Sequence, residues 1–124
     1  MRTTALIAGA GAAGAVARYG FESFVSRRVG GAFPWGTFVV NITGAFALGF
    51  LFTLLTGRFR LQPAYRSAIT VGFLGAYTTF STLAFETVRL LEDGAWLLGS
   101  ANALGSIAAG LVAMYGGIWL ARLV

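Results

Sequence analysis

Polar side chains recur at helical spacing inside the apolar stretches of this chain. Thr78, Thr82 and Glu86 stand at i, i+4 and i+8, which would place two hydroxyls and a carboxylate on one helix face. Asn102 and Ser106 repeat the four-residue spacing further along. Because lipid penalises polar groups, these faces are expected to point inward, where they could line a narrow hydrated path. Serine and threonine can also bond back to the carbonyl four residues earlier, so each stripe also admits a packing role.

Arg18 is a cation deep inside the first apolar stretch, about four helical turns from Arg2. A charged side chain at the centre of a membrane helix costs about 2.5–3.5 kcal/mol unless it meets water or a partner. Two interpretations are open. Arg18 either draws anions into a water-filled vestibule, or it reaches the interface or pairs with Glu22 four residues on.

Asn41 lies inside the second apolar stretch, and Thr37, one turn earlier, extends the same polar stripe. An asparagine amide offers two donors and an acceptor, so it can bind a partly dehydrated anion or join helices. Phe80 interrupts the polar run of the third stretch, between Thr79 and Ser81. The positive edge of its ring could meet a dehydrated anion, although packing is the commoner role of a phenylalanine.

The composition indicates a membrane protein. The 124 residues are 57% hydrophobic and 10% charged, which is too little charge to solvate a globule of this size. The absence of cysteine and histidine excludes disulfides, thiolate nucleophiles and the usual zinc or haem ligands, so we do not expect an enzyme. The basic residues are scattered arginines rather than a cluster, which argues against nucleic-acid binding.

The hydrophobic pattern predicts an all-α membrane protein with four transmembrane helices in a single domain, residues 1–124. The predicted spans are residues 3–24, 33–56, 66–91 and 95–123, each long enough to cross a core of about 30 Å. The first could be a signal peptide, but its alanine and glycine content and the three later spans favour an uncleaved helix. The third contains a polar run, residues 72–82, where the bilayer centre should be. Such a run is tolerated only where protein or a cavity covers it, so it is the leading candidate for a functional site.

The charges predict the orientation only weakly. The side with the termini would carry Arg2, Arg58, Arg60, Arg66 and Arg122, and the other side Arg27, Arg28 and Arg89. The positive-inside rule favours cytoplasmic termini, but so small a difference permits both orientations. Glycines in three of the spans would let helices approach closely, and four thin helices would hardly enclose a pore, so we expect an oligomer.

Three segments resemble the small fluoride channels known as the Fluc or CrcB family. They are residues 14–19 (GAVARY), residues 35–44 (WGTFVVNITG), and residues 72–82 (GFLGAYTTFST) followed by Glu86. Together with the four-span size, the resemblance covers nearly the whole chain. It implies an antiparallel, dual-topology homodimer with two fluoride pores at the subunit interface, in the inner (plasma) membrane of the cell. A pair of distinct subunits of opposite orientation is the alternative.

The resemblance also implies roles for particular residues. The third helix would break near Gly75 to Thr78, and the backbone carbonyls of these two residues, from both subunits, would hold a structural sodium ion (Na+). Asn41 and Phe80 would contact fluoride, and Arg18 would line the entrance. The polar track would include Thr82, Glu86 and Ser106, and Thr37 is assigned to the same pore from its place on the stripe of Asn41.

Two positions differ from the family pattern. Leu83 stands where a second phenylalanine is usual, which leaves the ring pair incomplete, and Asn102 stands where a tyrosine is common. The implied function is passive export of cytoplasmic fluoride. A proton-coupled multidrug or cation exporter is the alternative, although it would need a carboxylate in the middle of the first span, where this chain has Arg18. A non-transporting assembly subunit would explain the glycines but not the polar stripes.

Overall fold

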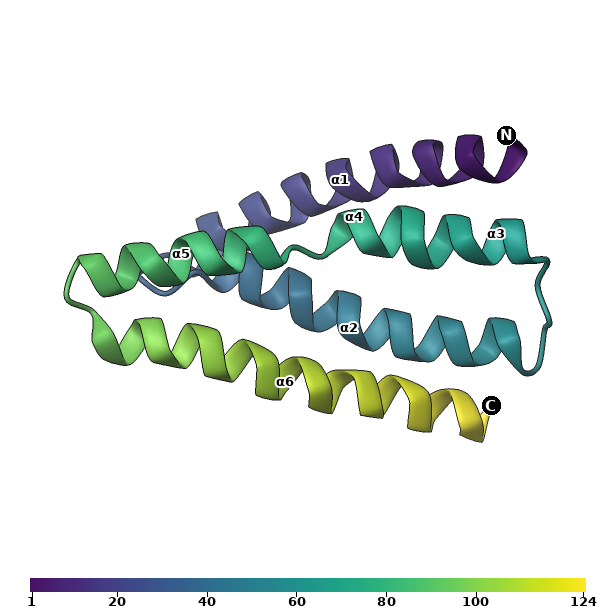
Figure 1. Ribbon diagram of the computed structural model, residues 1–124. Helices are drawn as coiled ribbons and strands as arrows, with labels where there is room; N and C mark the ends of the chain where they lie inside the picture. Colours follow the sequence, from purple (N-terminus) through teal and green to yellow (C-terminus); the bar gives the residue numbers. More distant parts are fainter.

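The computed structural model describes residues 1–124 as an all-helical chain (Figure 1). The helices are α1 Arg2–Val29, α2 Trp35–Thr56, α3 Pro63–Ser67, η1 Ala68–Leu74, α4 Gly75–Tyr77, α5 Phe80–Glu92 and α6 Trp96–Leu123. η1 is a π-helical segment that joins α3 to α4 without interruption, so the third predicted span is one rod broken before α5. The predicted break in this helix is confirmed.

Three helical segments are long and apolar enough to cross a membrane. They are Trp35–Thr56, Pro63–Glu92 and Trp96–Leu123, which agree with the second, third and fourth predicted spans to within a few residues. The first predicted span falls inside α1, which is 28 residues long but is not among the three. Its alanines, glycines and arginines dilute the apolar character that a span requires.

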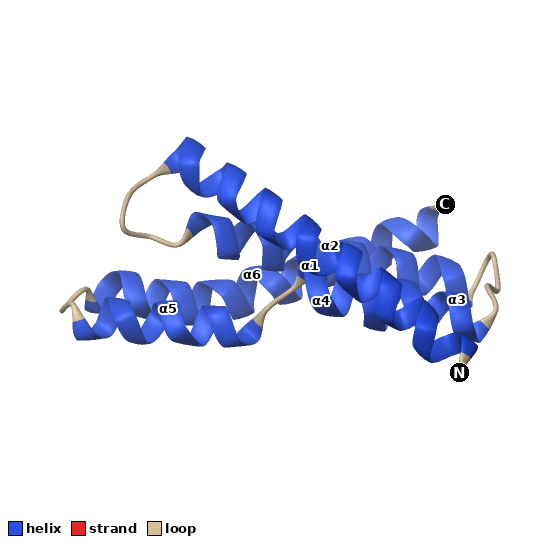
Figure 2. Cartoon of the chain, turned by 90° about the horizontal axis from the view of Figure 1, so that it is seen from above, coloured by secondary structure: helices blue, strands red, loops and turns tan.

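Both termini and the loop between α2 and α3 lie at one end of the molecule (Figure 1). The loops from α1 to α2 and from α5 to α6 lie at the opposite end, as expected for alternating crossings. α2 packs along α6, whereas α1 packs mainly on η1. Seen from above, α1 and α5 diverge toward the end with the two short loops (Figure 2). At that end α1 terminates at Gly30 and Gly31, whose φ values of 68° and 84° favour glycine.

The closest helix contacts occur at glycines. A Cβ atom at Gly14 would overlap the carbonyl oxygen of Phe73 in η1, and one at Gly117 would overlap the carbonyl oxygen of Phe46 in α2. In lipid, where no hydrophobic drive joins helices, such close backbone approach supplies the packing energy. These two glycines therefore fix the α1–η1 and α2–α6 pairs.

We expect Gly14→Ala to separate α1 from η1, because the new methyl group has no space. Overpacking of this kind costs about 1–3 kcal/mol. Thermal unfolding of the detergent-solubilised protein measures the loss. Gly9→Ala, on the same helix but with no atom within 4 Å of the added Cβ, is the matched control and should unfold like the unmodified protein. Equal unfolding temperatures for the two variants would contradict the predicted contact.

The single chain has a thin core. Only 18 of its 124 residues are buried, and many large apolar side chains lie on the outside. A protein in lipid can leave such residues facing acyl chains, but polar groups on the same surface need a cover. The extended backbone at the helix break is a polar group of this kind.

Candidate functional site

The helix break consists of two extended residues, Thr78 and Thr79. Their φ, ψ values are −88°, 155° and −148°, 115°, outside the helical region. Thr79 is also the N-cap of α5, since its side-chain oxygen accepts a hydrogen bond from the Thr82 backbone N–H at 3.2 Å. The polar run therefore contains a true end of one helix and a capped start of the next.

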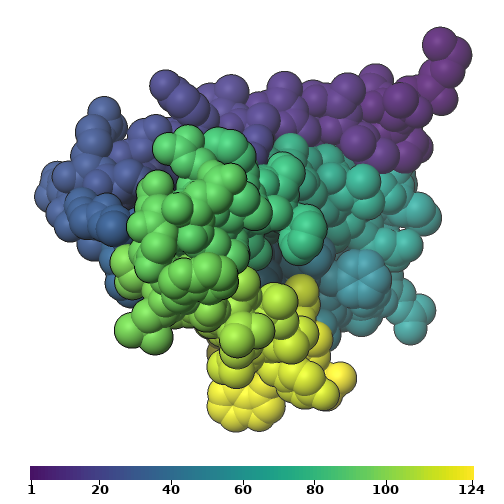
Figure 3. Space-filling view, turned by 60° about the vertical axis from the view of Figure 1, so that its left-hand side comes forward, coloured from purple at the N-terminus to yellow at the C-terminus, as the bar shows by residue number.

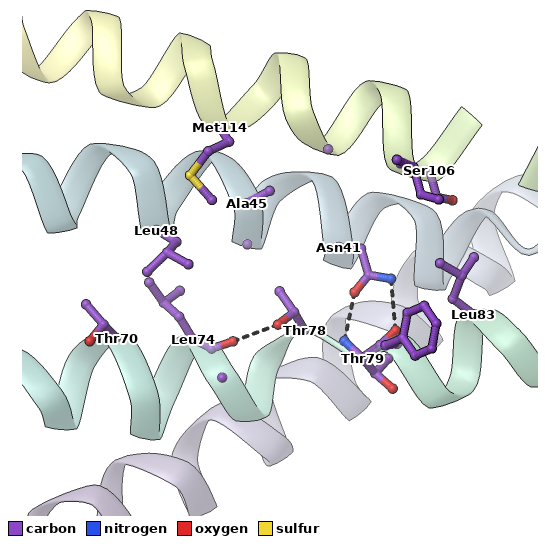
Figure 4. A pocket seen from close by; sticks show the side chains of 15 residues that line it. Asn41, Ala45, Leu48, Thr70, Leu74, Thr78, Thr79, Leu83, Ser106 and Met114 are labelled. Atoms are coloured by element: carbon purple, nitrogen blue, oxygen red, sulfur yellow. Dashed lines mark hydrogen bonds between the residues drawn. The ribbon is translucent and has the colours of Figure 1, made fainter. Parts of the chain in front are cut away.

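Asn41 of α2 pairs with the backbone of the break (Figure 4). Its Oδ1 accepts a hydrogen bond from the Thr79 N–H at 2.8 Å, and its Nδ2 donates to the Thr79 carbonyl at 3.1 Å. The side-chain amide thus replaces the peptide partner that Thr79 would have in a continuous helix. Because an amide NH₂ has two hydrogens, one donor of Asn41 remains after this pairing. Both interpretations of Asn41, a link between helices and a donor to an anion, are compatible with its position.

The break also removes the backbone N–H groups that would bond the carbonyl oxygens of Gly75 and Thr78 in a continuous helix. In a continuous α-helix the Thr79 N–H would bond the Gly75 carbonyl, but here it bonds Asn41. The Thr82 N–H would likewise bond the Thr78 carbonyl, but it bonds the Thr79 side chain instead. The Thr78 carbonyl accepts no backbone hydrogen bond. Two carbonyl oxygens at the break are therefore deprived of their regular helical partners.

A groove of about 320 Å³ lies against the break, between α2, α6 and the two halves of the third span. Five of the predicted site residues line it: Asn41, Gly75, Thr78, Phe80 and Ser106. Figure 3 shows a recess between the green residues of α5, the yellow residues of α6 and the teal residues before the break. None of the side chains that line the groove is charged. The lining of the groove is uncharged and carries a few hydrogen-bonding groups.

Phe80 and Leu83 both line the groove but differ in exposure. Phe80 is 78% exposed in the single chain, whereas Leu83 is 8% exposed. The Leu83 side chain is thus already packed within the chain. The Phe80 ring, at the first position of α5, lies on the surface of the single chain.

Thr82 and Glu86 lie outside the groove, which corrects the prediction of one continuous polar face with Thr78. The reason is the break itself, because two extended residues interrupt the helical periodicity before α5 begins. Thr78 instead bonds back to the Leu74 carbonyl at 3.1 Å. Thr82 accepts a hydrogen bond from the Thr79 hydroxyl at 3.0 Å.

A second polar cluster joins three helices at the end with the short loops. The Thr37 hydroxyl of α2 lies 2.8 Å from Glu86 Oε1 of α5 and 3.3 Å from Glu22 Oε1 of α1. Thr37 is 1% exposed, and the second carboxylate oxygen of Glu86 is buried with no partner. Through Thr37, this cluster connects α1 with α5, and these two helices diverge toward the end with the short loops (Figure 2).

Helical spacing contained no signal for the contact of Glu22 with Thr37, because the i, i+4 spacing suggested Arg18 as a possible partner instead. The Glu22 carboxylate lies 3.3 Å from the Thr37 hydroxyl of α2, and no ion pair with Arg18 is formed. Arg18 is half-buried and donates no hydrogen bond to another side chain. This arrangement disfavours the pairing with Glu22, and it is compatible with both the anion vestibule and the reach to the interface.

Asn102 and Ser106 of α6 face the interior, as their spacing predicted. Asn102 is fully buried at 0% exposure and Ser106 is 6% exposed. Ser106 lines the groove, and Asn102 lies one turn behind it against Thr87 of α5, to which it donates at 3.0 Å. Helical spacing could not identify Thr87 as the partner of Asn102, because the two residues lie on different helices.

Comparison with known proteins identifies the family. Residues 5–118 match the family described as CrcB-like protein, Camphor Resistance (CrcB). A protein named fluoride-specific ion channel FluC from Solibacter usitatus is 47% identical over 117 residues, covering 94% of this chain and 96% of the relative. One of the same name from Nitratidesulfovibrio vulgaris is 42% identical over 124 residues, covering both chains fully. The chain belongs to the CrcB-like family, a family of ion channels rather than enzymes, as its composition and motifs predicted.

Proposed function

We propose that this chain forms a fluoride-selective channel that passively exports cytoplasmic fluoride. One observation carries the proposal. The groove at the break offers hydrogen-bond donors from Asn41 and Ser106 and the ring of Phe80, with no charged side chain in its lining. A small anion that gives up its water needs donors at close range, and a carboxylate there would repel it. The relatives named as fluoride-specific channels support the choice of ion.

The groove is open along one side in the single chain, and we propose that a second copy covers it. Gly75 and Phe80 are exposed beside it. Extended backbone and exposed carbonyls are not tolerated against hydrocarbon, so lipid alone is a poor cover. An antiparallel homodimer, with α1 as the fourth span of each subunit, would place two such grooves at one interface in the plasma membrane. A pair of distinct subunits would satisfy the same requirement.

We propose that the carbonyl oxygens at the break hold a structural Na+. The carbonyls of Gly75 and Thr78 have lost their i+4 partners to Asn41 and to the Thr79 side chain. Hard cations are held by oxygen ligands of this kind, and unwound helix carbonyls serve as such sites in transporters. Bound there, the ion would neutralise carbonyl dipoles that would otherwise face each other across the dimer. It would be structural rather than transported.

The remaining predicted residues are assigned to the approaches of the pore. The Arg18 guanidinium, with no ion pair to satisfy it, would attract anions to the entrance. Thr37, Thr82 and Glu86 would continue the polar track along α5 beyond the groove. The membrane potential supplies the driving force, about 2.3 kcal/mol per charge per 100 mV.

The test is ion efflux from liposomes that contain the purified protein, with a potassium gradient and valinomycin to set the potential. We expect rapid fluoride efflux and little chloride efflux. Chloride passing as readily as fluoride would overturn fluoride selectivity, and absence of any efflux would overturn the channel. Uptake of a quaternary ammonium driven by a proton gradient would instead indicate the exporter alternative, which the groove disfavours because no carboxylate lines it.

Phe80→Ile is expected to lower fluoride efflux by about tenfold, the equivalent of about 1.4 kcal/mol, because the aliphatic side chain has no positive edge. Folding should be little affected, since the ring is 78% exposed in the single chain. The matched control is Phe85→Ile on the same helix, at a residue that is 62% exposed and does not line the groove. Equal efflux from the two variants would remove Phe80 from the pore.

A further inference from the structure

Asn102 is the most completely buried polar side chain of α6. It is 0% exposed, and its Nδ2 donates to the Thr87 hydroxyl oxygen at 3.0 Å. The Thr87 hydroxyl in turn donates its single hydrogen to the Leu83 carbonyl at 2.8 Å. Toward Asn102, Thr87 can therefore act only as an acceptor. This fixes the orientation of the amide, with Nδ2 toward Thr87 and Oδ1 away from it.

The fixed orientation leaves two buried oxygens without a partner in the chain. No protein donor reaches Asn102 Oδ1, and no protein group pairs with Ser106 Oγ, which lies one turn further along the same face. Side chains four residues apart on a helix are neighbours, with Cβ atoms about 5–6 Å apart. An acceptor and a hydroxyl at that separation can share one small hydrogen-bonding molecule.

The chemistry of the pair selects the ligand. An anion would be repelled by Asn102 Oδ1, because that atom can only accept. A metal ion would find two neutral oxygens, and no cluster of acidic or other ligating residues lies nearby. Water has both donors and acceptors, and buried waters bind polar groups that the protein leaves unpaired.

We propose that Asn102 and Ser106 hold one buried water molecule in the wall of the groove, and that this water orients the Ser106 hydroxyl toward the ion. The water donates one hydrogen to Asn102 Oδ1 and the other to Ser106 Oγ. The hydroxyl hydrogen of Ser106 is then free to point into the groove, where it donates to an anion. Asn102 is a positioning residue that acts through water and Ser106, and its role in transport rests on the proposed fluoride channel.

The first test is fluoride efflux from liposomes. Asn102→Leu keeps a similar volume but removes the acceptor, and we expect efflux to fall about tenfold without a lower unfolding temperature. Ser100→Leu, at an exposed position of the same helix, is the control. Thr87→Val should lower efflux as well, Thr87→Ser should restore it, and the double variant with Asn102→Leu should be no worse than Asn102→Leu alone. Unchanged efflux in Asn102→Leu, or additive losses in the double variant, would overturn the positioning role.

A second test observes the water itself and does not depend on transport. The chain contains only two asparagines, Asn41 and Asn102, so protein labelled with [15N]asparagine gives two side-chain amide signals. The signal missing from Asn102→Leu belongs to Asn102. We expect a cross-relaxation peak between it and a long-lived water, weakened in Ser106→Ala. Absence of that peak would overturn the water site even if fluoride efflux is observed, and its presence would support the site even if the channel proposal failed.

Discussion

Asn41→Leu is expected to reduce fluoride efflux at least about a hundredfold, the equivalent of about 2.8 kcal/mol. The leucine would leave both the N–H and the carbonyl of Thr79 without the partners that Asn41 now supplies. Each unsatisfied buried group costs about 1–3 kcal/mol. The variant would also lose the remaining amide donor in the groove. The break and the anion site therefore fail together, because one side chain serves both.

The measurement combines liposome efflux with thermal unfolding. Thr53→Val is the matched control, since its hydroxyl only bonds back to the Gly49 carbonyl of the same helix, at 2.7 Å. It removes a polar group from α2 without leaving any backbone group at the break unpaired. An Asn41→Leu protein that unfolds and conducts like this control would show that the break does not depend on the amide.

The polar run showed from the sequence where the third span is unusual, and the break itself was implied by the family resemblance. Glycines and a polar run stood at membrane depth, where continuous apolar helix would be expected. The position was shifted, however, since α4 continues through Gly75 and the extended residues are Thr78 and Thr79. The end point depends on Asn41, 38 residues earlier in the chain. Helical periodicity contains no information about that partner.

The same limit explains why two spacing arguments failed. The predicted face joining Thr78 to Thr82 and Glu86 assumed one unbroken helix, and the alternative in which Arg18 pairs with Glu22 assumed that neighbours on one helix prefer each other. In the fold the break interrupts the face, and the Glu22 carboxylate lies beside the buried Thr37 hydroxyl of α2. Spacing determines which residues share a face, but competition between helices determines which of them bond. Asn102 and Ser106 kept their predicted shared face because α6 is unbroken.

Thr37→Val is expected to destabilise the protein by about 3 kcal/mol. Fluoride efflux should fall at least as much as the fraction of folded protein does. The Thr37 hydroxyl is the hydrogen-bond donor to the Glu86 carboxylate, whose other oxygen is already buried without a partner. Leaving a buried carboxyl oxygen without its donor costs about 1–3 kcal/mol. Thr37→Ser, which keeps the hydroxyl, is the control and should stay close to the unmodified protein in unfolding temperature.

The single hydroxyl hydrogen of Thr37 cannot serve both carboxylates at once. The shorter contact, 2.8 Å against 3.3 Å, assigns it to Glu86 rather than to Glu22. A double-mutant cycle of Thr37→Val with Glu86→Gln should therefore give a larger coupling energy than a cycle with Glu22→Gln. Measured by thermal unfolding, equal couplings would mean that the hydroxyl is shared between α1 and α5. A larger coupling to Glu22 would reverse the assignment and make α1 the helix that Thr37 holds.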